Sequence, residues 1–227
     1  MDEDYDLRGF ANVCRLFPLP RVVLFPHAVL PLHIFEPRYR RMTEDALAGD
    51  QLVTIVQSKV RAPGHPAGDP PIEAVGCLGR ILQHERLPDG RFNFLLLGRK
   101  RVRLIRELGG TPPYRRAEAE ILEDEPAETP EGPRRAALIR LFRAVLESGE
   151  PLDPDFAALL DSSLPLGALT DLVAHALTLP AGIKQGLLNE TRIDRRADRL
   201  HAILEGLARR APPSNRDDRF PPPFSRN

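Results

Sequence analysis

The segment 30–42, LPLHIFEPRYRRM, contains the residues whose side chains could most readily do chemistry. His33 and Glu36 place an imidazole and a carboxylate three residues apart, and these are the groups of general acid–base catalysis. Arg38 and Tyr39 follow directly and would suit a charged or aromatic ligand. The segment also ends a strand-like apolar run at Phe35. Three interpretations are therefore open: a catalytic site, a binding site, or a turn from a strand into a helix.

The rest of the chain does not supply the partners that a catalytic site would need. Ser162 and Ser163 look like a helix terminus, and none of the three lysines lies in a Ser–Lys arrangement. His27 and His33 have no cysteine or carboxylate pair at metal-ligand spacing. Neither a phosphate-binding GxxxxGK[ST] loop nor a GxGxxG motif occurs. We predict no catalytic residue, no cofactor and no metal, and a chain that is not an enzyme.

Residue preferences at the start of a helix explain the sequence of this segment, and no catalytic role is needed to account for it. Pro37 at a first helical position needs no hydrogen-bond partner and presets its own φ angle. Glu36 would then stand at the helix start, where the free amides and the helix dipole stabilise a carboxylate. A helix is expected from Pro37 to about Ala48, ended by Gly49. The residues that remain candidates for ligand or partner binding, or for a fold signature, are His33, Phe35, Glu36, Arg38 and Tyr39.

A second candidate surface is the basic run GRKRVRLIR at residues 98–106. Arg99, Arg101 and Arg103 stand at alternate positions, so a strand would place them on one solvated face. Such a face could contact phosphates, although no aromatic residue for base stacking lies next to it. The run therefore leaves open an RNA-binding alternative, with an ordinary solvated face as the favoured interpretation.

The elements that must position these residues fall into two groups. Short apolar runs separated by proline and glycine turns predict many strands, hence a barrel or sandwich, up to about residue 122. Apolar residues at helical spacing follow, for example Ile193, Ala197, Leu200 and Leu204. We expect the following parts: a flexible N-terminus (1–12), a β-domain (13–122), an acidic linker (123–133), a helical bundle (134–210) and a disordered proline-rich tail (211–227).

Composition sets broad limits on the class of protein. The 227 residues carry 32 basic and 32 acidic side chains, so the net charge of zero gives no sign of a nucleic-acid partner. Cys14 and Cys77 lie far apart and fit reduced, buried thiols. The acidic N-terminus has no apolar leader, and no apolar run approaches the ~18 residues of a membrane span. We expect a cytoplasmic protein with no membrane contact.

In combination, several segments resemble the Lon protease N-terminal, substrate-binding domain family. They are LFPLPRVVLFPHAVLPLHIFEPRYRRMTEDALAGDQLVTIVQ, VGCLGRI, ERLPDGRFNFLLLGRKRVRL and LPLGALTDLVAHALTLPAGIKQGLLNETRIDRRADRLHAIL, within residues 13 to 210. The resemblance implies an α+β fold, a mostly antiparallel PUA-like β-barrel followed by a C-terminal helical bundle. It implies no catalytic residues in this region. It also suggests a stand-alone domain without the ATPase and Ser–Lys protease parts of Lon.

The resemblance and the residues together favour one function over two others. The favoured one is a non-catalytic recognition module that binds a polypeptide, either a substrate or a partner protein, through the barrel and its junction with the helices. The first alternative is an RNA-binding module that uses residues 98–106. The second, less favoured, is a barrel that binds or converts a small molecule in a deep pocket near His33 and Glu36.

Overall fold

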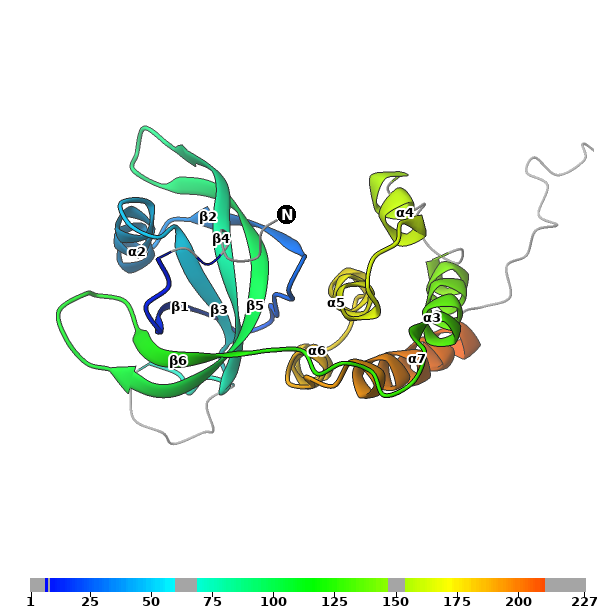
Figure 1. Ribbon diagram of the computed structural model, residues 1–227. Coiled ribbons are helices and arrows are strands. Elements are labelled where there is room, and N and C mark those ends of the chain that lie inside the picture. The colour runs from blue at the N-terminus through cyan, green and yellow to red at the C-terminus, as the bar shows by residue number, and fades with distance from the viewer. Residues whose placement is uncertain (1–6, 8, 60–68, 147–153, 211–227) are drawn as a thin grey trace, which may run out of the picture.

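The structure is a computed structural model that describes residue 7 and residues 9–59, 69–146 and 154–210 (Figure 1). The tail predicted for residues 211–227 and most of the N-terminus predicted for residues 1–12 lie outside the described residues. The elements follow in the order β1 (Val13–Leu19), β2 (Val29–Ile34), α2 (Pro37–Leu47), β3 (Leu52–Gln57), β4 (Val75–Arg86), β5 (Phe92–Leu108), β6 (Arg116–Leu122), α3 (Glu131–Leu146), α4 (Pro154–Asp161), α5 (Leu166–Ala176), α6 (Ala181–Leu188) and α7 (Ile193–Arg210).

The six strands form one sheet in the order β2–β5–β4–β3–β1–β6. A further pairing between β5 and β6 closes all strands except β2 into a barrel. Strands β1 and β3 run parallel, and the other described pairs are antiparallel. The predicted fold class, α+β with a mostly antiparallel barrel followed by helices, is confirmed.

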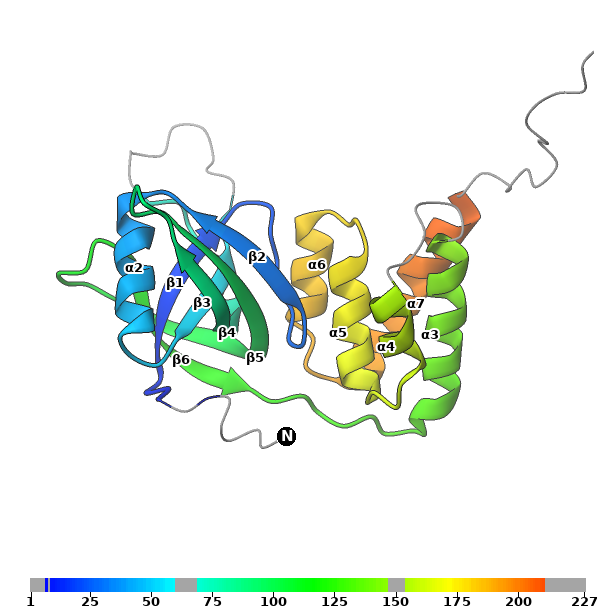
Figure 2. The same cartoon turned by 90° about the horizontal axis from the view of Figure 1, so that it is seen from above.

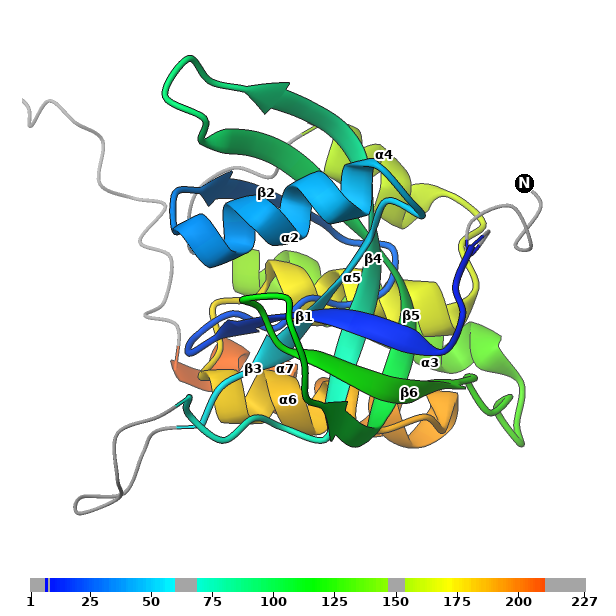
Figure 3. The same cartoon turned by 90° about the vertical axis from the view of Figure 1, so that its left-hand side faces the viewer.

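Strand β5 is long enough to belong to two parts of the sheet. Its second half pairs with β6 in the barrel, whereas its first half pairs with β2 and with the end of β4. We call this three-stranded part the arm: β2, residues 92–97 of β5 and residues 81–86 of β4. The β4–β5 hairpin at the tip of the arm extends beyond α2 (Figure 3).

Two apolar clusters hold the molecule together. The smaller one takes residues from all five barrel strands, such as Leu16, Leu78 and Val102, and fills the barrel. The larger one runs from α2, through residues such as Phe17 and Phe94, to the helices. Figure 2 shows α2 on one side of the strands and α5 and α6 on the other. The barrel and the helices therefore share a continuous core.

Helix α5 is the centre of the helical part. Its residues from Leu166 to Ala174 are all buried, and it contacts α3, α6 and α7. The predicted apolar stripe of α7 is confirmed as core, with Ala197, Leu200 and Leu204 buried. None of the described helices combines the length and the apolar character that crossing a bilayer requires.

The start of α2 differs from the prediction in one respect. Pro37 occupies the first turn and Glu36 the preceding position, as expected. The Glu36 carboxylate, however, makes no capping hydrogen bond to the helix amides and instead accepts one from Arg38 Nε at 3.0 Å. The helix is stabilised mainly through its buried face, which consists of Tyr39, Met42, Thr43 and Ala46.

The prediction of a solvated basic face on β5 is wrong for Arg101. This side chain is 2% exposed because the helical part packs over this part of the strand. A register shift opposite Leu78 and Gly79 also breaks the simple alternation of faces near Arg99. Arg103 is exposed and pairs with Glu120 at 2.9 Å. The strand therefore does not supply the continuous basic surface on which the RNA alternative depended.

Candidate functional site

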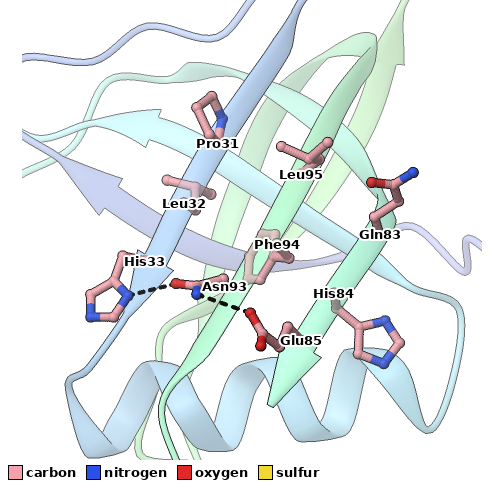
Figure 4. Close-up of a pocket in the computed structure, with 9 residues that line it drawn as sticks. All are labelled: Pro31, Leu32, His33, Gln83, His84, Glu85, Asn93, Phe94 and Leu95. Atoms are coloured by element: carbon pink, nitrogen blue, oxygen red, sulfur yellow. Dashed lines mark hydrogen bonds between the residues drawn. The ribbon is translucent and has the colours of Figure 1, made fainter. Parts of the chain in front are cut away.

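An open groove crosses the three strands of the arm (Figure 4). Its volume is about 460 Å³, within the usual range for ligand sites. The lining residues come from β2, β4 and β5: Pro31, Leu32, His33, Gln83, His84, Glu85, Asn93, Phe94 and Leu95. The groove therefore lies on strands that share a hydrogen-bonded framework rather than on a loop.

One end of the groove is apolar. Pro31 on β2 lies opposite Leu95 on β5, and both point to the face away from the core. Two large apolar side chains near this end are unusually exposed, Val29 at 43% and Leu82 at 48%. Leu82 stands at the register shift between Ile81 and Gln83, which breaks the alternation of faces along β4.

The other end of the groove is a polar row. His33 Nδ1 lies 2.7 Å from Asn93 Oδ1, and Asn93 Nδ2 donates to Glu85 Oε2 at 3.4 Å (Figure 4). Arg91 Nη1 lies 3.2 Å from His33 Nε2. Because arginine can only donate, Nε2 accepts from Arg91 and Nδ1 is left to donate to Asn93 Oδ1. Both ring nitrogens are engaged, which suits a positioning role better than proton transfer.

The predicted candidate residues divide between this groove and the core. Phe35 is 62% exposed, and its ring stacks on His33 with centroids 6.3 Å apart. Arg38 turns toward Glu36 and toward Asp69, which lies 3.1 Å from Arg38 Nη1. Tyr39 is buried, with its ring centroid 4.3 Å from that of Phe17. The structure thus places Phe35 beside His33, which lines the groove, whereas Tyr39 packs in the core.

The basic residues predicted as one patch occupy three different environments. Arg101 is buried under the helices, and Arg103 lies on the exposed face with Glu120. Arg99 is partly buried and lines a second cavity, of about 360 Å³, between β5 and the start of α5.

The sequence interpretation missed a buried cluster of charged residues between the barrel and the helices. We call it the joint: Arg101, Asp124, Asp171 and Arg196. Arg101 donates to both oxygens of Asp171, through Nη1 at 2.9 Å and through Nη2, and to Leu188 O at 2.9 Å. Arg196 is fully buried and donates to Thr170 Oγ1 at 2.9 Å.

Asp124 links the two arginines of the joint. Its Oδ1 accepts from Arg101 at 3.2 Å and from Arg196 at 3.0 Å, and its Oδ2 accepts a second bond from Arg196. Asp124 belongs to the segment 123–133, which the sequence predicted to be an acidic linker. The neighbouring Glu125 is also fixed, because its backbone N–H donates to Thr191 O at 2.9 Å. The segment between β6 and α3 is therefore attached to α7.

Electrostatics at the joint follow from this pairing. Burial alone would disfavour the charged form of Arg101, but the carboxylates of Asp171 and Asp124 favour it, and the pKa of Arg101 is raised. A signal for this cluster was present in the sequence, since Asp171 is the one charged residue in the apolar run LPLGALTDLVA. A carboxylate on the buried face of a helix requires a buried partner.

Both cysteine thiols are buried and free. Burial raises the pKa of Cys14 to about 11 and raises that of Cys77 as well, so neither thiol is a ready nucleophile. In the described ranges, no three His, Cys, Asp or Glu side chains gather as metal ligands would.

Comparison with known proteins identifies the family. The profile of the ATP-dependent protease La (LON) substrate-binding domain matches residues 13–206, which covers both the barrel and the helices. The chain belongs to the Lon substrate-binding domain family. The predicted resemblance is thereby confirmed.

Individual relatives agree with this family assignment. Lon protease 1 of Thermus thermophilus is 30% identical over 193 residues, and Lon protease of Azospirillum brasilense is 28% identical over 190 residues. Each alignment covers 83% of this chain but only 24% and 23% of the relative, so the chain spans about a quarter of these proteins.

Solved structures of the Lon family share this architecture. The crystal structure of a Lon N-terminal domain protein from Xanthomonas campestris aligns with a TM-score of 0.59 at 25% identity, over 84% of this chain and 97% of that one. The N-terminal domain of Lon protease from the Mycobacterium avium complex aligns with a TM-score of 0.58 at 17% identity, over 87% and 98% of the two chains. The second likeness bears on the fold alone.

Proposed function

We propose that this member of the Lon substrate-binding domain family is a non-catalytic recognition module that binds polypeptide in the groove of the arm. The observation that carries the proposal is the groove itself, with exposed apolar side chains next to a hydrogen-bonded polar row. The family description names a substrate-binding domain, and the matching relatives are proteases, whose substrates are polypeptides.

The chemistry of the groove suits a short extended segment. Its apolar end, at Pro31 and Leu95, would take an aliphatic or aromatic side chain out of water, which is favourable by about 25 cal/mol per Å². Its polar end offers amide, imidazole and carboxylate groups to the backbone or to polar side chains of the segment. Phe35 extends the apolar contact beside His33.

Binding of an unfolded model protein tests this proposal. Fluorescence anisotropy of labelled, reduced and carboxymethylated α-lactalbumin should rise on titration with the domain, and the native, disulfide-bonded form should bind much more weakly. Leu95→Asp should raise the Kd by about tenfold or more, since it places a charge on the apolar floor of the groove. Phe35→Ser should raise it by a smaller factor, near threefold.

Ile105→Ser is the matched control. Ile105 lies on the same strand as Leu95, and its exposure of 58% is close to the 62% of Phe35, but it lies outside the arm. Its loss should leave the Kd within experimental error, and urea unfolding should show that each variant is folded. The proposal fails if the unfolded probe does not bind, or if Ile105→Ser weakens binding as much as Phe35→Ser does.

A further inference from the structure

The last five residues of β4 form an uncovered strand edge. Residues 82–86 are all exposed, although the preceding residues 75–79 of the same strand are buried. The difference arises because β3 pairs with β4 only as far as Leu52, which lies opposite Arg80. Beyond that point β5 is the single strand partner of β4 in the described part of the chain.

The hairpin geometry fixes which backbone groups this edge presents. Leu87 N donates to Arg91 O at 2.8 Å, which makes this pair a hydrogen-bonded one. Bonded and non-bonded pairs alternate along an antiparallel ladder, so Glu85 is bonded to Asn93 whereas His84 and Arg86 point their N–H and C=O groups away from β5. Within the described ranges, no hydrogen bond reaches the backbone of His84 or Arg86 from the open side.

The opposite edge of the arm, on β2, is protected. Gly98 N donates to Ala28 O at 2.8 Å, so the even-numbered residues of β2 direct their backbone N–H and C=O groups toward β5. The backbone groups of Val29, Pro31 and His33 point to the open side of the strand. Pro31 has no N–H and interrupts the row of donors, which is a common protection of edge strands. Residues 82–86 contain no proline, so the two edges of the arm are not equivalent.

We propose that an extended segment of the bound polypeptide adds as a new strand along the open edge of β4, bonded to the backbone of His84 and Arg86. This inference rests on the proposed function and specifies its geometry. The two residues supply two donors and two acceptors, and any extended segment supplies the complementary groups. Gln83 and Glu85 line the groove, so side chains of the added strand on that face would lie beside the groove.

The size of the edge favours a transient segment over a second copy of the chain. Five residues at roughly 3.4 Å each give an edge of about 17 Å, with Leu82 as its exposed large apolar side chain. Stable interfaces bury roughly 1,200–2,000 Å², which a pairing of this length cannot reach alone. Backbone pairing also depends little on sequence, as recognition of diverse unfolded segments requires.

A proline substitution separates backbone recognition from side-chain recognition. His84→Pro removes the outward N–H and leaves the ladder to β5 intact, and proline is tolerated on strand edges. It should raise the Kd for carboxymethylated α-lactalbumin at least fivefold. His84→Ala removes an imidazole that lines the groove but keeps the N–H, so it should raise the Kd by a clearly smaller factor than His84→Pro. Equal effects of the two variants, or no effect of His84→Pro, would overturn the inference.

Methylated peptides test the same contact without changing the protein. An octapeptide of alternating valine and threonine can be N-methylated at its odd or its even positions. Strand addition needs one unmethylated edge of the peptide, so at least one of these two peptides should bind, whereas a peptide methylated at every position should not. Binding by the fully methylated peptide as tight as that of the unmethylated one contradicts the inference. Absence of binding by the unfolded probe would instead reject the proposed function. A dimer in sedimentation velocity that His84→Pro abolishes would show that a second copy occupies the edge, and would also overturn the inference.

Discussion

The two halves of strand β5 have opposite surroundings. Residues 92–97 lie in the arm, where their outer face forms the floor of an open groove. Arg101, a few residues further along, lies under the helices and is bonded to Asp171, Asp124 and Leu188. One strand therefore contributes both to an open, partly apolar groove and to a buried cluster of charged side chains.

This difference suggests separate roles for the two regions: the joint stabilises the fold, and the arm binds a ligand. At the joint, the hydrogen bonds of Arg101 and Arg196 are directed to groups of the chain itself, so these charges orient the helices against the barrel. In the arm Leu82 is exposed, as is Phe35 directly after β2, and both contribute little to the core. Substitutions at the joint should therefore change the free energy of unfolding, and substitutions at the arm should change binding.

Removing Arg101 is expected to give the largest effect. Arg101→Met leaves Asp171 buried without its main partner, which costs about 3–5 kcal/mol of the free energy of unfolding. Arg103→Met, two residues away, removes an exposed pair with Glu120 and should cost less than about 1 kcal/mol. Urea unfolding at neutral pH measures both values. Similar values for the two variants would mean that the joint does not hold the helices to the barrel.

Gly98 lies at the boundary between the two halves of β5 and gives the next largest effect. A Cβ there would overlap Phe25 O, so Gly98→Ala must displace the backbone that leads into β2. Overpacking of this kind costs about 1–3 kcal/mol. Gly206→Ala is the control, because a Cβ on Gly206 meets nothing within 4 Å and alanine should stabilise α7 by roughly 0.5–1 kcal/mol. Urea unfolding midpoints should move in opposite directions, and a shift in the same direction would contradict the close approach.

A pH-dependent loss of stability is expected on the joint side. His175 on α5 faces Phe25, with ring centroids 6.5 Å apart, and burial together with nearby Lys184 lowers its pKa from 6.5. Above pH 6.5 the imidazole is neutral in both states. As the pH falls below 6.5, the unfolded chain takes up this proton first, so the free energy of unfolding decreases until the folded-state pKa is reached.

His175→Gln isolates this contribution. The variant should lose less stability than the wild type between pH 6.5 and pH 5, as measured by urea unfolding at several pH values. An unchanged pH dependence would show that His175 is not the titrating group.

Much of the fold could be predicted because its signals are local. Pro37 and Gly49 mark the limits of α2, and the apolar stripe of α7 identifies its core face. The joint could not be predicted in the same way, because Arg101 and Asp171 are 70 positions apart. The alternation of side chains along the strand predicted that Arg101 lies on a solvent-exposed face, and only the packing of the helices on β5 buries it. The groove likewise depends on the pairing of β2 with β5, which joins residues far apart in the sequence: His33 and Asn93 are separated by 60 positions.

The smallest expected effect concerns Glu36, which lies between β2 and α2. A capping role predicted a loss of about 1 kcal/mol for Glu36→Ala. Because the carboxylate instead forms a partly exposed pair with Arg38, the loss in urea unfolding should be well below that value. Anisotropy with the unfolded probe should also be little changed, since Glu36 does not line the groove. If Glu36→Ala instead abolished binding at unchanged stability, the binding surface would extend from the groove to the start of α2.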